Sequence, residues 1–200
     1  EIRRQKDAKD LKTANLLYKD ASLAFKGMDA NGQVKAEATT KEAMGQLVRD
    51  YFANPSATRD KLVLVGTLGE GKRVTKMMRD ELKERGTLHG TAYKFRALTG
   101  RWYDNIDVQC GDRLRFTKKD MALGVVNGTS GVVDKVDGRF ITLRIESDIK
   151  AQDGRMVTVD TYKNRNFGHD WVRTVHKSQG QGKDAVFMLA NPAMTDTHMG

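Results

Sequence analysis

The sequence has 200 residues and a formal net charge of +9, from 35 lysines and arginines against 26 acidic residues. This excess favours a polyanionic partner, nucleic acid before an anionic membrane surface. Cys110 is the only cysteine, which excludes an intrachain disulfide and a cysteine-based zinc cluster and fits a reducing, cytoplasmic environment. No apolar run approaches the roughly 20 residues of a membrane span, and no signal-peptide pattern is present, so we expect no membrane insertion.

The first quarter of the chain, from residue 6 to residue 53, is predicted to be helical. The support is one apolar run and then a second apolar face at helical spacing: Leu11, Leu16, Leu17, Leu23 and Phe25, followed by Ala43, Leu47, Val48, Tyr51 and Phe52. The segment Asn54-Pro55-Ser56 is a clear stop signal.

The next segment predicts a strand followed by a helix. Lys61–Val65 is a continuous apolar run ahead of glycines, which is typical of a central parallel strand covered on both faces. We expect a helix over residues 71–85, with Gly86 as its C-cap. Its inward residues would be Val74, Met77, Met78 and Leu82. A strand, a turn and a helix in this order form a βα unit of an α/β fold.

Residues 93–161 have a different pattern, with short alternating segments and many turn residues. The predicted strands are Arg113–Phe116, Val132–Val136, Phe140–Ile145 and Met156–Tyr162. Asp137-Gly138 is a strong hairpin signal because both residues tolerate a positive φ. Four or five short strands in about 65 residues predict a small β-barrel.

Two later apolar segments, Trp171–Val175 and Ala185–Leu189, are predicted as strands of the α/β part. The predicted architecture is one α/β domain interrupted by a β-barrel. Residues 1–92 form its first part, residues 93–161 the inserted barrel, and residues 162–200 its second part. Because the chain opens with Glu1 and stops abruptly at Gly200, we expect it to be a piece of a longer protein.

The glycine-rich segment Gly66–Arg73 nearly matches the phosphate-binding loop pattern G-x-x-x-x-G-K-[ST]. Its last position is Arg73, where the pattern requires a Ser or Thr hydroxyl to hold magnesium. Glu70 would in addition face the phosphates. We therefore interpret the segment as a glycine-rich turn whose amides and Thr67 touch a nucleic-acid phosphate, or as an ordinary βα turn.

The segment Thr174–Gly180 reads Thr-Val-His-Lys-Ser-Gln-Gly and follows a predicted strand. Five of its side chains can donate hydrogen bonds, and two of them can carry positive charge. Such a cluster of donors where a strand gives way to a helix suits a phosphate backbone. A polar surface turn is the alternative interpretation.

The order of these segments resembles the C-terminal half of a superfamily 1 DNA helicase motor, in particular the RecD-like helicases and the helicase portion of conjugative relaxases of the TraA/TraI kind. Thr174–Gly180 is similar to helicase motif V, and Glu1–Gln5 is similar to the segment after motif III. The other similar segments are Lys61–Thr67 (the first βα unit of the second RecA-like domain), Gly111–Thr117 with Asn127–Gly131 and the Asp137-Gly138 hairpin (the inserted barrel), and Asp196–Gly200 (the lead-in to motif VI).

The resemblance implies an α/β fold, a RecA-like parallel-sheet domain with an inserted small SH3-type β-barrel. It implies that Arg4 senses the ATP γ-phosphate and that Gln5 lies in the same nucleotide-binding segment. It also implies a contact surface for single-stranded DNA, made by Thr67, Thr174, His176, Lys177, Ser178, Gln179 and Gly180. For His176, a purely structural role is the alternative.

The resemblance further implies that the parent protein uses ATP and Mg²⁺ and translocates 5′ to 3′. The first motor domain and the motif VI arginine are not in these 200 residues, so we expect the chain alone to bind no cofactor and to hydrolyse no ATP. The segment Gly180-Gln181-Gly182-Lys183 lacks the Glu that is common after motif V in related motors, which puts a nucleotide contact from this turn in doubt.

Two other functions stay open at this point. The chain can be a degenerate helicase-like module that binds single-stranded DNA or presents a translocation signal to the coupling protein of a type IV secretion system. Alternatively, it is an unrelated basic RNA-binding protein that uses the barrel. A complete phosphate-binding loop upstream and an arginine-bearing motif VI after Gly200 would favour the motor.

Other candidate residues have two interpretations each. A DNA track or a solvated helix face would explain the basic residues Lys72, Arg73, Lys76 and Arg79. Base stacking or buried packing would explain Trp102 and Tyr103, whereas we expect Trp171 in the core. His89 and the pair His169-Asp170 lack the partners of a metal site, so we predict no metal ligand and no catalytic triad.

Overall fold

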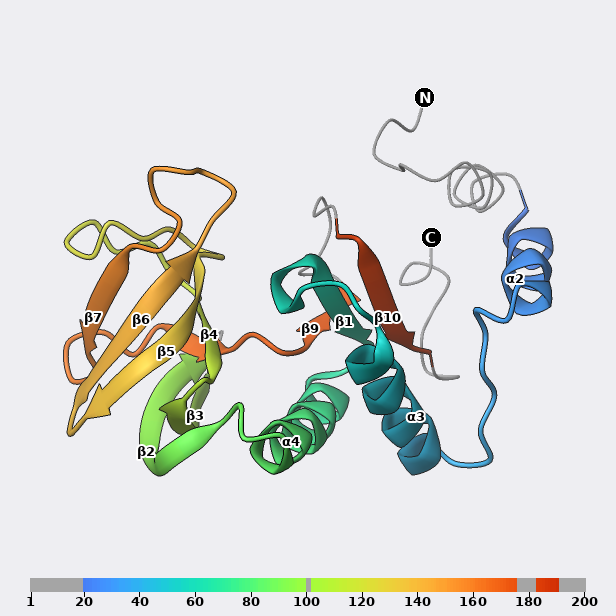
Figure 1. The fold of residues 1–200 in the computed structure, drawn as a ribbon, viewed down its shortest axis with the longest axis horizontal. Helices are drawn as coiled ribbons and strands as arrows, with labels where there is room; N and C mark the ends of the chain where they lie inside the picture. Colours follow the sequence, from blue (N-terminus) through green and yellow to red (C-terminus); the bar gives the residue numbers. More distant parts are fainter. Residues whose placement is uncertain (1–19, 100–101, 176–182, 191–200) are drawn as a thin grey trace. The chain divides into compact units, whose positions relative to one another are not determined.

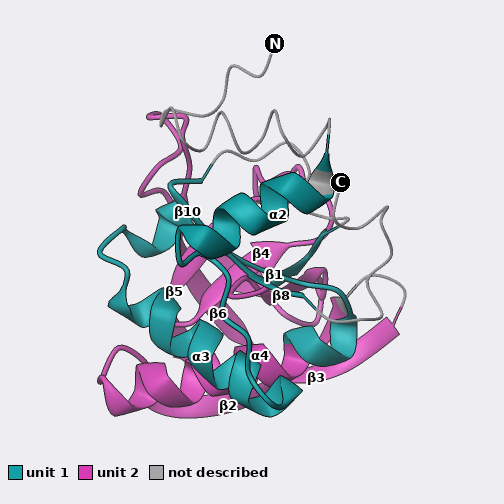
Figure 2. Ribbon diagram, turned by 90° about the vertical axis from the view of Figure 1, so that its right-hand side faces the viewer, with its two compact units in different colours: residues 1–71, 173–200 teal, residues 72–172 magenta. Residues whose placement is uncertain are grey.

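The computed structural model describes residues 20–99, 102–175 and 183–190. It divides into two compact units (Figure 2), and helix α4 (Leu68–Glu84) begins in the first and continues into the second. Unit 1 comprises residues 1–71 and 173–200, and unit 2 comprises residues 72–172. Unit 2 is therefore an insertion in the sequence of unit 1.

Unit 1 contains a parallel sheet of three strands in the order β10-β1-β9 (Figure 1). These are β1 (Lys61–Val65), β9 (Arg173–Thr174) and β10 (Ala185–Leu189). Four of the five β1 residues are buried, as expected of a strand covered on both faces. The α/β fold with a parallel sheet is thereby confirmed.

The helices of unit 1 are α2 (Ala21–Ala30) and α3 (Thr40–Ala53), followed by the 3-10 turn η1 (Thr58–Asp60). The predicted continuous helical segment is thus interrupted in its described part. Side-chain caps explain the two starts, because Asp20 accepts from the amide of Leu23 at 2.9 Å and Thr39 from that of Glu42 at 3.2 Å. The residues that α3 buries include Met44, Leu47, Val48 and Tyr51.

Helix α4 ends as the sequence predicts. Gly86 has a φ of 70°, and the amide of Thr87 donates to the carbonyl of Leu82 while the amide of Gly86 donates to that of Lys83. These two bonds are the Schellman arrangement that a glycine C-cap permits. No helix among the described residues combines the length and the apolar character needed to cross a membrane.

Unit 2 holds a two-stranded antiparallel ribbon and a five-stranded antiparallel sheet with the order β7-β6-β5-β4-β8. The ribbon consists of β2 (His89–Thr99) and β3 (Trp102–Cys110). The sheet consists of β4 (Arg113–Phe116), β5 (Ser130–Asp137), β6 (Phe140–Glu146), β7 (Met156–Asp160) and β8 (Phe167–His169). The ribbon was not among the predicted strands, whereas β4 to β7 were.

The ribbon and the sheet share one apolar core. Phe95 and Val108 from the ribbon pack in the same buried cluster as Phe116, Leu143 and Phe167 from the sheet. Within the described residues, neither sheet closes on itself, so the predicted closed barrel is not confirmed. The strand pattern alone fixed which residues face inward, but closure depends on hydrogen bonds between the two edge strands, which no alternation pattern encodes.

Two predicted details of unit 2 differ from the structure. In the hairpin between β5 and β6, Asp137 pairs with Phe140, so the two turn residues are Gly138 and Arg139. Only Gly138 has a positive φ, at 55°, which fits a type II′ turn. The predicted strand Trp171–Val175 is reduced to Arg173–Thr174, because the Trp171 indole lies in a buried polar cluster described below.

Candidate nucleic-acid interface

The carboxyl edge of the parallel sheet in unit 1 brings two predicted DNA contacts to one place. Val65, the last residue of β1, pairs in parallel with Thr174, the last residue of β9. Thr67 follows β1 by two residues, so it lies just beyond the edge at which β9 also ends. Ligands of open α/β sheets bind at this edge. His176, Lys177, Ser178, Gln179 and Gly180 come next in the chain and lie outside the described residues, as do Arg4 and Gln5.

Thr67 itself forms a helix cap. Its backbone amide and its hydroxyl both donate to Glu70 Oε2, at 2.9 and 3.0 Å, and the amide of Glu70 donates back to Thr67 Oγ1 at 3.2 Å. This reciprocal pair is a capping box, which starts α4 at Leu68 instead of the predicted residue 71. The hydroxyl of Thr67 thus donates its hydrogen to Glu70.

The capping box also corrects the glycine-rich turn. Gly69, Glu70, Gly71 and Lys72 lie within the first turns of α4, so the segment that resembles a phosphate-binding loop is mostly helix. Glu70 is buried and caps the helix, and does not face an anion. The segment is therefore a short βα turn followed by a capped helix, and a contact of its amides and Thr67 with a nucleic-acid phosphate stays a prediction.

The basic face predicted on α4 is largely paired with carboxylates. Lys72 Nζ lies 2.6 Å from Asp104 Oδ2, and Lys76 Nζ lies 2.5 Å from Asp80 Oδ2. Arg79 is buried, so it is not part of a solvent-facing track. Because the ion pairs neutralise these charges, the structure favours a solvated face over a DNA track for this helix.

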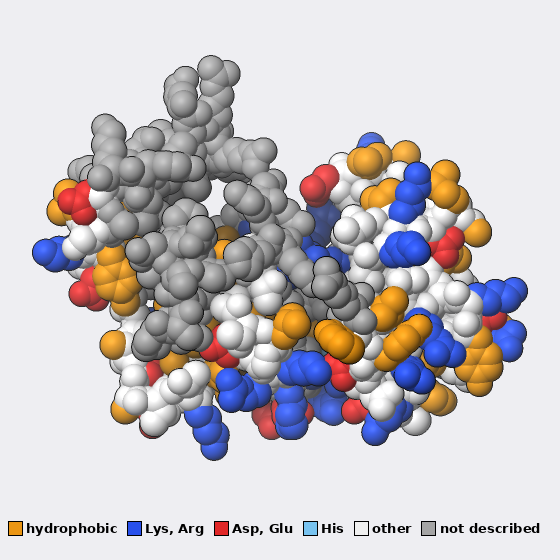
Figure 3. Space-filling model, turned by 180° about the vertical axis from the view of Figure 1, so that it is seen from behind, with side chains coloured by type: hydrophobic (Ala, Val, Ile, Leu, Met, Phe, Trp, Pro, Cys, Tyr) orange, Lys and Arg blue, Asp and Glu red, His pale blue; other side chains and the backbone are white. Residues whose placement is uncertain are grey.

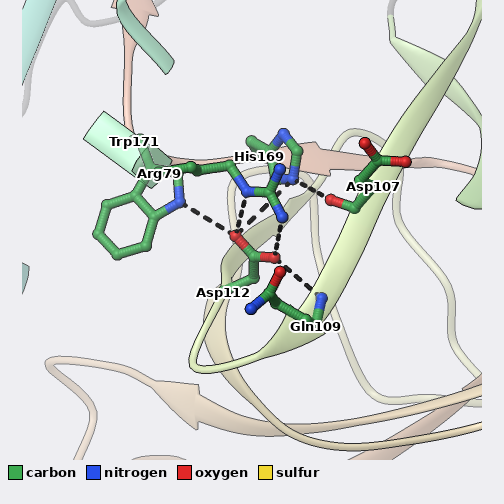
Figure 4. Close-up of polar contacts among 6 residues, drawn as sticks. All are labelled: Arg79, Asp107, Gln109, Asp112, His169 and Trp171. Carbon is green, nitrogen blue, oxygen red and sulfur yellow. Dashed lines mark hydrogen bonds and ion pairs between the residues drawn. The ribbon is translucent and has the colours of Figure 1, made fainter. Parts of the chain in front are cut away.

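Arg79 belongs to a buried polar cluster around Asp112 (Figure 4). Arg79 donates to both carboxylate oxygens of Asp112, with distances of 2.8 Å from Nε to Oδ1 and 2.9 Å from Nη2 to Oδ2. Asp112 also accepts from the backbone amide of Gln109 at 2.9 Å and from Trp171 Nε1 at 3.4 Å. The cluster joins α4, the turn between β3 and β4 and the segment after β8, all within unit 2.

His169 completes this cluster as a neutral side chain. Its Nε2 lies 2.9 Å from the backbone oxygen of Asp107, and since a carbonyl can only accept, Nε2 carries the hydrogen. Burial lowers the pKa of His169 below its ordinary value of 6.5, and the charge of Arg79 lowers it further, against the opposing effect of Asp112. His169 is thus a neutral member of the cluster that donates one hydrogen bond through Nε2. The described part of the chain contains no group of three His, Cys, Asp or Glu side chains that could hold a metal ion.

Four exposed aromatic residues of unit 2 form two groups. Trp102 is 76% exposed at the end of the β2–β3 ribbon, where Arg96 lies over the ring of Tyr103 at 4.5 Å. Arg139 lies over the rings of Phe140 and Tyr162 at 5.0 and 5.3 Å. The second group was missed in the sequence, because Tyr162 is more than 20 positions from Arg139 and Phe140, and only the pairing of β6 with β7 brings it to them. Trp171 is buried, as expected.

Basic and apolar side chains are mixed on the surface of unit 2. Toward the right of Figure 3, Lys and Arg side chains lie beside exposed hydrophobic ones, and acidic side chains are fewer there. This mixture of cations and apolar groups is the kind of surface that suits single-stranded nucleic acid, which presents both phosphates and unpaired bases.

Comparisons with known proteins identify related sequences. The chain is 30% identical over 172 residues to the conjugal transfer protein TraA of Agrobacterium fabrum, a match that covers 86% of this chain and 15% of that protein. A probable conjugal transfer protein TraA of Sinorhizobium fredii is 30% identical over 171 residues, again 15% of its length. The chain therefore spans about 15% of the curated relatives it matches. No family model matches the chain.

Solved structures of helicases share the fold. A Pif1 helicase from Bacteroides, in complex with ADP-AlF3 and single-stranded DNA, superposes with a TM-score of 0.59 at 16% identity, over 99% of this chain and 47% of that one. A structure of two coordinating Pif1 helicases at forked DNA gives the same TM-score at 14% identity, over 100% of this chain and 44% of that one. The predicted resemblance to conjugal transfer proteins of the TraA kind is confirmed, and the fold is shared with the Pif1 helicases.

Proposed function

We propose that this chain is part of a conjugative relaxase-helicase and forms the second motor domain that holds single-stranded DNA. The observation that carries the proposal is the sheet register, which pairs Thr174 at the end of β9 with Val65 at the end of β1, two residues before Thr67. The relationship to TraA proteins and the Pif1-like fold support it.

In this proposal the DNA contacts come from the segment after β9. Thr174 and His176 donate hydrogen bonds to backbone phosphates, Lys177 adds charge, and Ser178, Gln179 and Gly180 shape the turn. Thr67 contributes by fixing the start of α4 at the same edge, because its hydroxyl is committed to Glu70.

The nucleotide contacts are proposed for the parent protein. Arg4 would sense the γ-phosphate of ATP, with Gln5 beside it, and Mg²⁺ would accompany the nucleotide. ATP would bind between this domain and a first motor domain elsewhere in the same protein. We expect no ATP hydrolysis by this chain alone, and we expect strand movement in the 5′ to 3′ direction in the parent.

We also propose that unit 2 is the counterpart of the small SH3-type barrel inserted in RecD-like motors. The common core of the ribbon and the five-stranded sheet supports this, since both sheets face one apolar interior. The predicted bounds, residues 1–92 and 162–200 for the RecA-like part and 93–161 for the insertion, stay a prediction and are narrower for the insertion than unit 2, which comprises residues 72–172.

A second candidate function is a degenerate helicase-like module that binds single-stranded DNA or is recognised by the coupling protein of a secretion system. The match spans only 15% of the TraA relative, which leaves room in such a protein for a helicase-like module without motor activity. The motif-bearing sequences on either side of this segment in the parent distinguish the two functions.

The test of DNA binding is fluorescence anisotropy with a labelled single-stranded oligonucleotide at two salt concentrations. We expect the double variant His176→Ala/Lys177→Ala to bind roughly tenfold more weakly than the unaltered chain. Loss of the Lys177 charge should make the negative slope of log association constant against log salt concentration less steep by about 0.7.

The matched control is Lys41→Ala, which removes one charge from an exposed position of α3 in the same unit. It should leave affinity and slope unchanged. Equal weakening by both variants would mean that binding depends on overall charge alone. Undiminished binding in the double variant would contradict the proposed segment.

A further inference from the structure

A cation-aromatic cluster lies on the surface of unit 2, at the turn between β5 and β6. Its members are Arg139 in the turn, Phe140 at the start of β6 and Tyr162 just after β7. The Arg139 guanidinium carbon is 5.0 Å from the centre of the Phe140 ring and 5.3 Å from that of Tyr162. Phe140 is 41% exposed and Tyr162 is 70% exposed.

The backbone around this cluster is fixed by a dense set of hydrogen bonds. The amide and the hydroxyl of Thr161 both donate to the carbonyl of Arg139, at 3.0 and 2.9 Å. The Asp160 carboxylate contacts two members of the cluster. Its Oδ1 accepts from the backbone amide of Tyr162 at 3.0 Å, and its Oδ2 lies 3.3 Å from Arg139 Nη2. Phe140 pairs with Asp160 across the sheet.

An exposed cluster of this kind contributes little to the free energy of folding. A large aromatic side chain held in water forgoes the burial that normally stabilises it. Single exposed apolar residues need no explanation, but two exposed rings within about 5 Å of one guanidinium form a cation-aromatic surface. An arginine that stacks on rings can still form ion pairs through its in-plane N–H groups, as Arg139 does with Asp160.

We propose that the cluster of Arg139, Phe140 and Tyr162 is a stacking platform for an unpaired base of single-stranded nucleic acid. Tyr162 receives the base on its ring, and Arg139, paired with Asp160, lies over the Tyr162 and Phe140 rings as the cationic part of the platform. Exposed Lys163 and the net charge of +9 favour the same polyanion. This inference rests on the proposed function, to which it adds a contact point outside the segment Thr174–Gly180.

The other exposed aromatic group has weaker support as a binding surface. Trp102 lies at the end of the ribbon next to residues outside the described part of the chain. Asp104, two positions further on, adds a negative charge there, although it pairs with Lys72. Trp102 is therefore the matched control, because it is an aromatic residue of similar exposure in the same unit.

The experiment is anisotropy binding of a single-stranded oligonucleotide to the whole chain and to Tyr162→Ala, Tyr162→Phe and Trp102→Ala. We expect Tyr162→Ala to bind roughly tenfold more weakly, as for the loss of one stacked base. Tyr162→Phe keeps the ring and should bind as the unaltered chain does, and so should Trp102→Ala. Because Tyr162 is largely exposed, its removal should leave the thermal unfolding temperature unchanged.

A second measurement locates the contact directly. An oligonucleotide that carries 5-iodouracil, irradiated in complex with the chain, should crosslink to Tyr162 or Phe140. Equal binding by Tyr162→Ala and the unaltered chain would overturn the platform, and if His176→Ala/Lys177→Ala is weakened in the same assay, the proposed function stands. Loss in Tyr162→Phe equal to that in Tyr162→Ala would overturn stacking as the mechanism. Absence of any binding by the unaltered chain would overturn both proposals.

Discussion

Arg79 and Asp112 form a fork-to-fork ion pair inside unit 2, with both nitrogen-oxygen distances below 3.0 Å and the Asp112 side chain fully buried. The pair links the middle of α4 to the turn between β3 and β4. A planar guanidinium satisfies both carboxylate oxygens at once, and the amide of Gln109 completes the coordination. The ion pair therefore holds α4 against the β3–β4 turn within unit 2.

The first prediction concerns this pair. Asp112→Asn should lower the free energy of unfolding by about 3–5 kcal/mol, because it leaves the buried charge of Arg79 without a counter-ion. Urea titration followed by circular dichroism measures the change. The control is Glu81→Gln in the exposed pair of Glu81 and Arg85, where the expected change is below about 1 kcal/mol. Similar losses in both variants would contradict the importance of the buried pair.

The second prediction concerns pH. Burial lowers the pKa of His169 below its ordinary value of 6.5, so the unfolded chain binds a proton more readily than the folded one. The stability that depends on neutral His169 is complete above pH 6.5 and should decrease as the pH falls below it, toward the lower pKa of the folded state. Urea midpoints at pH 7.5 and pH 5.5 measure this decrease.

His169→Gln is the matched variant for this prediction, because an amide nitrogen can replace the hydrogen bond from Nε2 to the Asp107 carbonyl. Its stability should change less between the two pH values. An identical pH dependence in both proteins would assign the effect to other groups.

The third prediction concerns the cap of α4. Thr67→Ala should lower the free energy of unfolding by about 1 kcal/mol, because the amide of Glu70 loses its acceptor. Thr67→Ser keeps the hydroxyl and should recover most of the loss. If Thr67→Ala were as stable as Thr67→Ser yet bound DNA more weakly, the hydroxyl would serve the ligand and not the helix.

The fourth prediction concerns Gly111, which has a φ of 87° in the turn before Asp112. A Cβ at this position would lie 2.1 Å from the backbone oxygen of Thr87. Gly154 has a similar φ of 78° but open space around it. We expect Gly154→Ala to cost about 1 kcal/mol from backbone strain alone, and Gly111→Ala to cost clearly more. Equal costs in thermal unfolding would show that the backbone relieves the overlap.

Much of the local structure could be predicted from the sequence. The bounds of β1 and β10 match the structure because a run such as Lys61–Val65 is long, apolar and bounded by turn residues. The start of α4 was predicted three residues late, because the glycines suggested a loop and outweighed the Thr67 and Glu70 spacing of a capping box. The three-residue spacing of Thr67 and Glu70 is visible in the sequence and predicts the start of α4 at Leu68.

The remaining features depend on tertiary structure. Nothing local in the sequence pairs Arg79 with Asp112 or brings Arg139 to Tyr162, since these residues are separated by more than 20 positions. The β2–β3 ribbon was missed because its exposed residues, such as Lys94 and Arg96, are polar and mask the inward Phe95 and Ala97. Of the predicted site, Thr67 and Thr174 lie at one edge of the sheet, the other residues lie outside the described part of the chain, and DNA contact by any of them stays a prediction.

The parallel pairing of β1 with β9 has a consequence for the order in which the chain folds. Val65 and Thr174 are neighbours in the sheet but are separated by about 110 residues of sequence, so closing this loop in an unfolded chain carries a large entropy cost. The hairpins of unit 2 join residues close in sequence and form with little such cost. We therefore expect the inserted unit to fold early and shorten the path between the two strands, so that the edge with Thr174 is among the last parts of the molecule to form.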